Sequence, residues 1–354
     1  MNSYDHLVES ATRLLCSLIA IPSVSRDENA AADCMESFMR SAGMEPRRIG
    51  NNLLLGEDRM VEGRKTILLN AHIDTVKPAA TWTYDPFTAT REGDMIYGLG
   101  SNDCGGGLVS LLMAYQYLSQ RPQKYNLLYL ASAEEEVSGA EGIRKVLPLL
   151  PVIDVAIVGE PTGMQPAIAE RGLMVLDLEA KGKSGHAARN EGVNAIYEML
   201  RDLQWIHDFK FAKVSPYLGP TSMQLTVINA GTQHNVVPDV CKAIVDVRTN
   251  EFYDNEDVFA FIQSNLKSSV KARSFHLKSS RISEQHPLVT WLTARGKQPF
   301  GSPTLSDQAL MSFPSFKLGP GQSSRSHSAD EYIAIPEISD AITTYIEMLD
   351  GFTF

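Results

Sequence analysis

The chain has 354 residues, of which 44% are hydrophobic and 21% charged, and its formal net charge is −10. At roughly 150 residues per domain, this length predicts two domains. Lysines and arginines are scattered without a basic stripe, which argues against a nucleic acid partner. No apolar run approaches the ~18 residues that span a bilayer. Acidic residues stand where a secretory signal needs basic ones, and the four cysteines are dispersed, so we expect a cytoplasmic protein without a membrane partner.

Helix and strand patterns alternate in the first half of the chain. Apolar spacing predicts helices over 7–21, 29–43 and 106–121, the last ending before Pro122. Continuous apolar runs predict buried strands at 66–74, 126–134 and 154–161. This alternation favours an α/β fold with a mainly parallel sheet covered by helices.

The pattern changes near residue 170. Alternating apolar residues predict strands at 173–182, 222–231, 241–250 and 274–279, with helices at 193–209 and 256–266. The order βαββαβ is that of a ferredoxin-like domain. A strand at 315–321 and a helix at 337–352 then resume the α/β pattern. The sequence therefore predicts an inserted domain at 170–281, flanked by a first domain made of 1–169 and 282–354.

Histidines and carboxylates follow the predicted strands of the first domain. In an open α/β sheet, ligands bind outside the carboxyl ends of the strands. His72 and Asp74 point to the same side of their strand, where a metal-ligating histidine commonly donates its other ring N–H to a carboxylate. A buried polar pair is the alternative. The residues that we expect at this rim are His72, Asp74, Glu135, Glu136, Glu160 and His327.

Asp103 lies in the glycine-rich loop 98–107, which lacks the Lys-Ser/Thr ending of a phosphate-binding loop. A carboxylate held by such a loop can bridge two cations. Asp103, Glu136 and Glu160 would bring −3 against the +4 of two Zn²⁺ ions, which accept nitrogen and oxygen ligands. A Cys104 thiolate would disturb this balance, so we expect a buried, non-ligating cysteine. The run 134–136 alone is also compatible with a solvated acidic cap, and its residues do not fix which glutamate is a base.

Eight segments together resemble the M20 family of zinc-dependent metallopeptidases and deacylases. Within that family they are most similar to the acetylornithine deacetylase group, which includes acetylcitrulline deacetylase and succinyl-diaminopimelate desuccinylase. The segments occur in the family's order and are AHIDTV, GLGSNDCGG, AEEEVSGAEG, VGEPT, SGHAA, GTQHNVVPD, DVRT and SHSADEYI.

The resemblance implies a role for each candidate metal-site residue. His72 and Glu160 would hold one zinc, Glu136 and His327 the second, and Asp103 would bridge both, with cobalt or manganese as alternatives. Asp74 would orient His72, and Glu135 would be the general base. The family also implies a cis peptide between Asp103 and Cys104.

The resemblance assigns the inserted domain to lid and homodimer contacts. His186 would reach the partner's site and stabilise the oxyanion, while Asn235 and Arg248 would bind the substrate's carbonyl and α-carboxylate. A planar guanidinium suits a carboxylate, although a surface strand residue is the alternative for Arg248. Gly319 and Gly321, with Thr232, would shape the substrate pocket.

These features predict a metal-dependent amidohydrolase that removes a short acyl group from an N-acyl amino acid by means of a water between the zinc ions. N-acetylornithine or N-acetylcitrulline in arginine biosynthesis is the expected substrate. The alternatives are a desuccinylase acting on succinyl-diaminopimelate or succinylated citrulline or ornithine, and an aminopeptidase or dipeptidase. A solute-binding protein is less favoured. A serine hydrolase is also less favoured, because no G-x-S-x-G elbow occurs.

Overall fold

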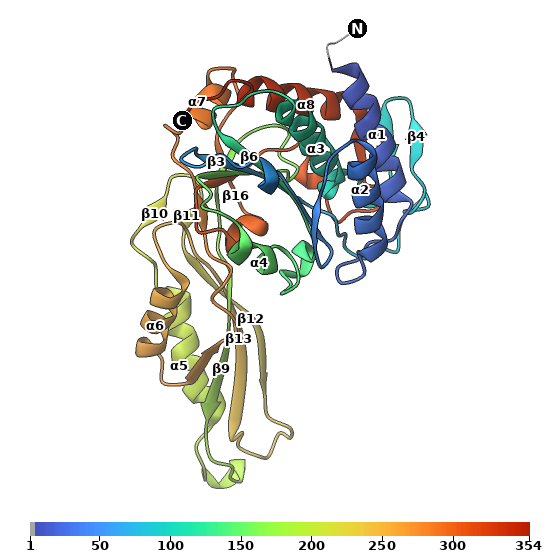
Figure 1. Ribbon diagram of the computed structural model, residues 1–354. Helices are drawn as coiled ribbons and strands as arrows, with labels where there is room; N and C mark the ends of the chain where they lie inside the picture. The colour runs from blue at the N-terminus through green and yellow to red at the C-terminus, as the bar shows by residue number, and fades with distance from the viewer. Residues whose placement is uncertain (1–3) are drawn as a thin grey trace. The chain divides into compact units, whose positions relative to one another are not determined.

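The computed structural model describes residues 4–354 and divides the chain into two compact units (Figure 1). The larger unit consists of Met1–Ile168, Ile282–Phe300 and Ser306–Phe354, and the smaller one of Ala169–Arg281 and Gly301–Leu305. Residues 1–3, which the predicted first domain includes, lie outside the described residues. None of the helices within residues 4–354 is long and apolar enough to cross a membrane.

Residues 301–305 correct the predicted domain boundary, since they belong to the smaller unit. The backbone carbonyl of Ser302 accepts the N–H of Arg171 at 3.4 Å. Gly301 lies so close to Tyr217 that an added Cβ would be 2.4 Å from the Tyr217 carbonyl oxygen. These contacts join segments far apart in the sequence, so no local sequence pattern predicts that residues 301–305 belong to the smaller unit.

The main sheet has the strand order β1-β2-β6-β3-β7-β17-β8-β15, and β16 also pairs with β8. The central strands β6, β3, β7 and β17 are parallel to their neighbours in this group. The predicted mainly parallel sheet is therefore confirmed. The strands are β1 Arg47–Ile49, β2 Asn52–Leu55, β3 Thr66–His72, β6 Asn126–Ser132, β7 Val155–Val158, β8 Ala167–Glu170, β15 Ser280–Arg281, β16 Phe300–Ser302 and β17 Ser315–Lys317.

Helices cover this sheet on both faces. α1 (Asp5–Ile19), α3 (Gly106–Ser119) and α8 (Ile335–Leu349) contact one another, and α2 (Asn29–Ser41) packs against α1 (Figure 1). On the other face, Ile143 and Val146 of α4 (Ile143–Val146) pack with Leu68 and Leu128. The remaining elements are α7 (Pro287–Thr293) and a small sheet of β4 (Thr90–Glu92), β5 (Met95–Tyr97) and β18 (Tyr332–Ala334).

The glycine-rich start of α3 is explained by packing. An added Cβ at Gly107 would lie 1.7 Å from the carbonyl oxygen of Gly159, which follows β7. Only glycine allows the helix to approach the strand end this closely. The sequence Gly105–Gly107 therefore brings the Asp103 loop against the segment that carries Glu160.

The smaller unit is an antiparallel sheet of order β12-β13-β9-β14 with two helices, which is the ferredoxin-like arrangement expected from the sequence. Residues Met174, Leu176 and Leu178 of β9 pack with Met199 of α5 and Ile262 of α6. The elements are β9 Met174–Lys181, α5 Ala195–Asp208, β10 Val214–Ser215, β11 Gly219–Pro220, β12 Ser222–Ala230, β13 Val240–Arg248, α6 Asn255–Asn265 and β14 Ser269–Ala272.

The last strand of this unit ends earlier than predicted. Residues 274–279 are not a strand, because the side-chain amide of Asn255 donates to the carbonyls of Phe275 (3.3 Å) and Leu277 (2.9 Å). The Leu277 carbonyl also accepts the backbone N–H of Leu173, just before β9, at 2.9 Å, but this single contact does not extend into a strand. The strand β14 at Ser269–Ala272 takes the predicted place beside β9.

Candidate metal centre

Three neighbouring parallel strands of the larger unit bring acidic and histidine side chains to one edge of the sheet. β3 ends at His72, which is in register with Ser132, the last residue of β6. The turn 134–136 follows β6, and Glu160 follows β7 on the other side of β3. Parallel strands end at the same edge, so residues far apart in the sequence meet here.

Asp103 lies between two histidines. Its Oδ1 is 3.3 Å from His72 Nε2, and its Oδ2 is 3.6 Å from His327 Nε2. Glu160 Oε1 lies 3.6 Å from His72 Nε2, and Glu136 Oε2 lies 3.0 Å from His327 Nε2. The carboxylate of Asp103 thus offers one oxygen to each side, as a carboxylate shared by two cations does.

The structure brings together all five side chains that the sequence analysis selected as metal ligands. One group with potential ligand atoms within 4.8 Å of one another is Asp103, Glu136 and His327. A second consists of His72, Cys104 and Glu160, and a third of His72, Glu135 and Glu136. All of these residues belong to the larger unit.

The His72 ring is oriented by a backbone group. Its Nδ1 lies 2.8 Å from the Asp74 carbonyl oxygen and 3.6 Å from the nearer Asp74 carboxylate oxygen. The ring N–H at Nδ1 therefore donates to the carbonyl, which leaves Nε2 facing Asp103 as a potential ligand atom. The prediction of Asp74 as the orienting residue agrees with this position, although the acceptor is its backbone oxygen.

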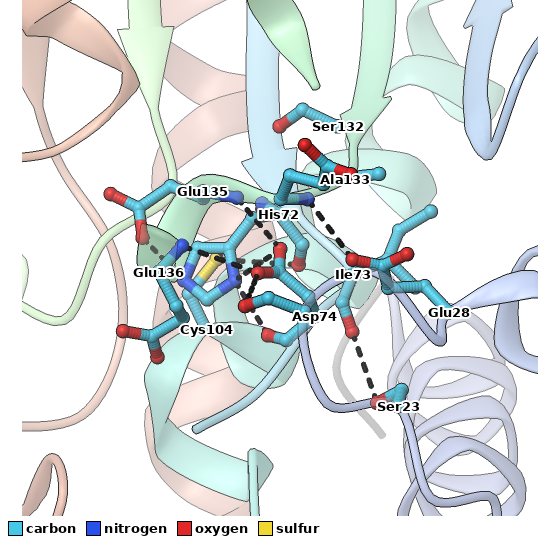
Figure 2. Close-up of polar contacts among 12 residues, drawn as sticks. Ser23, Glu28, His72, Ile73, Asp74, Cys104, Ser132, Ala133, Glu135 and Glu136 are labelled. Atoms are coloured by element: carbon cyan, nitrogen blue, oxygen red, sulfur yellow. Dashed lines mark hydrogen bonds and ion pairs between the residues drawn. The ribbon is translucent and has the colours of Figure 1, made fainter. Parts of the chain in front are cut away.

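The Asp74 carboxylate instead holds the turn that carries Glu135 and Glu136. It accepts the backbone N–H groups of Glu135 at 3.1 Å and Glu136 at 3.2 Å (Figure 2). It also accepts the Ser25 hydroxyl at 2.6 Å. Glu136 approaches His327, whereas Glu135 Oε2 is 4.0 Å from His72 Nε2. The two neighbouring glutamates therefore serve different parts of the site.

Cys104 is 1% exposed and contacts the strand backbone. The backbone N–H of His72 donates to its Sγ at 3.3 Å, and the thiol lies 3.7 Å from the His72 carbonyl oxygen. Burial raises the pKa of the Cys104 thiol to about 12. These contacts agree with the expected structural role, although Sγ also belongs to the group of potential ligand atoms formed with His72 and Glu160. The Asp103–Cys104 peptide is cis, as the resemblance implied.

The charges at this edge fit a bound cation. Oε1 of Glu160 is buried and, among the described residues, has no hydrogen-bond partner. Burial and the neighbouring Asp103 raise the pKa of Glu160 to about 8, and burial raises the pKa of Glu135 well above its ordinary value. The hydrogen bond to Glu136 raises the pKa of His327 to about 9. Crowded, desolvated carboxylates of this kind are stabilised by a metal ion.

Glu331 is a buried carboxylate of this region that the sequence analysis did not select. It is 2% exposed, and burial raises its pKa to about 7. It accepts backbone N–H groups of the loop that carries Asp103. Its place four residues after His327, within the segment SHSADEYI, was the available signal.

Two of the predicted substrate residues lie on adjoining loops of the smaller unit. His186 forms an isolated bridge with Val236, and the N–H of Ala187 donates to the Asn235 carbonyl at 3.1 Å. His186 does not belong to a long helix. Its Nδ1 caps the short turn Ala187–Arg189, and α5 begins only at Ala195 after an Asn194 cap. His186 is an exposed loop residue, so its ring is accessible for a contact.

The other predicted substrate residues have local partners. Arg248 forms a two-point ion pair with Asp246, at 2.8 and 3.1 Å, on the same face of β13. An added Cβ at Gly319 would meet the Glu160 carbonyl oxygen at 2.4 Å, and one at Gly321 would meet Asn102 Oδ1 at 2.1 Å. The two glycines therefore pack against the segments that carry metal-site residues. Thr232 is exposed.

Comparisons with known proteins agree with this geometry. Residues 68–351 match the model of peptidase family M20/M25/M40. The chain is 30% identical over 357 residues to acetylornithine deacetylase of Klebsiella pneumoniae, covering 89% of this chain and 91% of the relative. It is 29% identical over 274 residues to succinyl-diaminopimelate desuccinylase of Paracoccus denitrificans, covering 73% and 72%.

A solved structure extends the likeness to nearly the whole fold. A Bacillus subtilis protein described as a dinuclear metal binding peptidase of the M20 family superposes with a TM-score of 0.73 at 16% identity, covering 98% of this chain and 100% of the other. At that identity the likeness concerns the fold. The family match covers most of the chain and includes the carboxyl end of each strand that leads to the candidate metal centre. The chain therefore belongs to peptidase family M20/M25/M40 and is a hydrolase of that family.

Proposed function

We propose that this chain is a dinuclear metal-dependent deacylase of N-acyl amino acids, with N-acetylornithine or N-acetylcitrulline in arginine biosynthesis as the substrate. The observation that carries the dinuclear site is the position of Asp103 between His72 and His327, 3.3 and 3.6 Å from their Nε2 atoms. His72 and Glu160 would hold one ion, Glu136 and His327 the other. We propose zinc, with cobalt or manganese as substitutes, since imidazole and carboxylate suit all three.

The reaction follows from the placement of the side chains around that centre. Two bound cations would polarise the amide carbonyl and make a water nucleophilic near neutral pH. Glu135 Oε2 lies 4.0 Å from His72 Nε2, beside the proposed centre, and its carboxylate would accept the proton of the attacking water and pass it to the leaving amine. Asp74 keeps Glu135 and Glu136 in place through their backbone N–H groups.

Substrate recognition would come from the smaller unit. His186 and Asn235 lie on adjoining loops and would donate to the carbonyl oxygen as it becomes anionic, a contribution of ~2.7–4 kcal/mol for one such donor. Arg248 would bind the α-carboxylate while it keeps its pair with Asp246. In the larger unit, Gly319 and Gly321 would shape the part of the pocket next to the candidate metal ligands.

The acyl group is the more specific part of the proposal, because similar relatives include both an acetylornithine deacetylase and a succinyl-diaminopimelate desuccinylase. The desuccinylase of P. denitrificans is the specific reason to retain succinyl-diaminopimelate as a second candidate. A succinyl group brings one more carboxylate than an acetyl group and would require one more cationic partner. We would assay N-acetylornithine, N-acetylcitrulline, N-succinyl-diaminopimelate and a dipeptide panel side by side. A kcat/KM highest for dipeptides would contradict the deacylase proposal.

We also propose that the chain works as a homodimer through the smaller unit, in a reducing cytoplasmic compartment. β12 is an edge strand, and Val227 and Ile228 on it are 40% and 46% exposed. The adjoining α5 leaves Tyr197 and Leu200 65% and 51% exposed. An unprotected edge beside apolar side chains favours pairing with a second copy. All four cysteines are free, as a reducing compartment requires.

Mixed dimers test whether His186 acts in the partner's site. His186→Ala and Glu135→Gln chains, each inactive alone, would be unfolded together and refolded. If His186 acts across the dimer, one site of each mixed dimer contains both native residues, and part of the activity returns. If it acts within its own chain, no site is complete and the mixture stays inactive. Light scattering of Ile228→Lys would separately measure the dimer.

A further inference from the structure

Glu331 connects the two segments that supply Asp103 and His327. Its Oε1 accepts the backbone N–H groups of Asn102 and Asp103, both at 2.8 Å, and its Oε2 accepts that of Gly100 at 2.8 Å. All three donors belong to the loop that presents the Asp103 carboxylate. Glu331 itself lies only four residues after His327.

A second contact fixes the same loop from the other side of His327. The Asn102 side chain donates to the Gln322 carbonyl at 3.1 Å and accepts the Gln322 N–H at 2.9 Å. The segment 322–331 therefore holds the loop 100–103 at two points, with His327 between them. The positions of Asp103 and His327 are in this way coupled through hydrogen bonds.

We propose that Glu331 is a positioning residue of the metal centre, which holds Asp103 and His327 at the separation required by the cation that they share. The inference rests on the proposed dinuclear function. Glu331 touches neither the cation nor the substrate, and acts through the Asp103 backbone. Groups that orient metal ligands in this way typically change metal affinity 10–100-fold when they are replaced.

The neighbouring Asp330 provides a matched control. Its carboxylate also accepts three hydrogen bonds, from the Thr83 N–H (2.8 Å), the Thr83 hydroxyl (2.8 Å) and the Tyr84 N–H (3.2 Å). Those donors carry no candidate metal ligand. A general role in anchoring the segment 322–331 would be shared by Asp330 and Glu331. A role in positioning Asp103 would belong to Glu331 and not to Asp330.

The test compares Glu331→Gln with Asp330→Asn. In Glu331→Gln, an amide NH₂ replaces one of the two oxygens that accept backbone N–H groups, and an NH₂ cannot accept these hydrogen bonds. Metal-free proteins would be titrated with Co²⁺ and Zn²⁺ by calorimetry, and the visible spectrum of bound Co²⁺ would report ligand geometry. We expect the affinity for one of two ions to fall about 10–100-fold in Glu331→Gln. We further expect an altered Co²⁺ spectrum and a lower kcat at unchanged KM that excess metal restores.

The controls separate the possible failures. Asp330→Asn should keep the affinity and spectrum of the native chain, and Glu331→Asp, which keeps the charge, should lie between Gln and native and serves if Gln does not fold. Two ions bound with native affinity in Glu331→Gln, or equal losses in Asp330→Asn, would overturn the inference. A native chain that binds fewer than two ions would instead count against the proposed function.

Discussion

The carboxylate of Asp74 accepts the backbone N–H of Glu135 at 3.1 Å, and it also accepts that of Glu136 at 3.2 Å. Asp74 is 1% exposed, so these bonds form away from water. Its own backbone carbonyl holds the His72 ring at the same time. Asp74, two residues after the end of β3, thus orients the candidate ligand His72 and the turn after β6 that carries the candidate base Glu135 and the candidate ligand Glu136.

We expect Asp74→Asn to lower kcat about 10–100-fold with little change in KM, because an amide cannot accept from two backbone donors and the Ser25 hydroxyl as a carboxylate does. Steady-state kinetics with metal content measured in parallel checks this. Ser25→Ala, which removes only the hydroxyl contact, is the control and should have a much smaller effect. A native kcat in Asp74→Asn would show that the turn 134–136 keeps its position without the Asp74 carboxylate.

Replacing Glu135 by Gln should remove turnover and keep the metal. The amide cannot take a proton, so we expect kcat to fall about 10²–10⁴-fold. Elemental analysis should still find two ions per chain, since the proposed ligands are intact. The control is Glu141→Gln, in the same segment between β6 and α4, whose side chain forms an ion pair with Lys145; it should keep native activity. Retained turnover in Glu135→Gln would refute the assignment of the base.

Removal of the metal should abolish activity and lower thermal stability together. Binding to the native state alone adds RT ln(1 + [L]/Kd), which is about 2.7 kcal/mol at a hundredfold excess over Kd. We expect the Tm to fall after dialysis against a chelator and to recover on adding Zn²⁺, Co²⁺ or Mn²⁺, and the restored kcat would rank the three ions. Full activity at undetectable metal content would contradict the proposal.

The sequence was sufficient to predict the sheet and the five candidate ligands. His72, Glu136 and Glu160 follow apolar strands closely, and parallel strands place such residues at one edge whatever the rest of the chain does. His327 follows β17 at a longer distance, through a glycine- and serine-rich loop, and was selected because that strand also ends at this edge. The role of each ligand came from the family resemblance, because spacing alone left the 134–136 run open.

What the sequence missed depends on contacts between distant backbone groups. In the sequence, Glu331 cannot be told from a surface glutamate, because its role depends on hydrogen bonds from the loop 100–103. Residues 274–279 have the alternating pattern of a strand, yet the Asn255 side chain donates hydrogen bonds to two of their carbonyls. The acceptor for His72 is a carbonyl, which every residue possesses, so no residue type marked it.

Cys104→Ala tests whether the thiol is a metal ligand. Sγ lies 3.3 Å from the His72 backbone nitrogen, so the thiol's role in this arrangement is packing against β3. We expect two ions per chain and a kcat within a few-fold of native, with a modest loss of stability from the small cavity. Loss of one ion, with a native Co²⁺ thiolate charge-transfer band that disappears in the variant, would make Cys104 a ligand.

Arg248→Met should raise KM for N-acyl amino acids and leave kcat nearly unchanged. A hydrogen bond to a charged group contributes about 1.5–3 kcal/mol, which corresponds to roughly a 10–150-fold change in KM. The control is Arg273→Met, because Arg273 forms an equivalent two-point pair with Asp177 in the same sheet, both bonds at 2.9 Å. An analogue whose α-carboxylate is converted to an amide should show no difference between native and Arg248→Met, since the interaction is then missing in both. If the amide analogue is affected as strongly as the acid, Arg248 supports the sheet through Asp246 and does not bind the carboxylate.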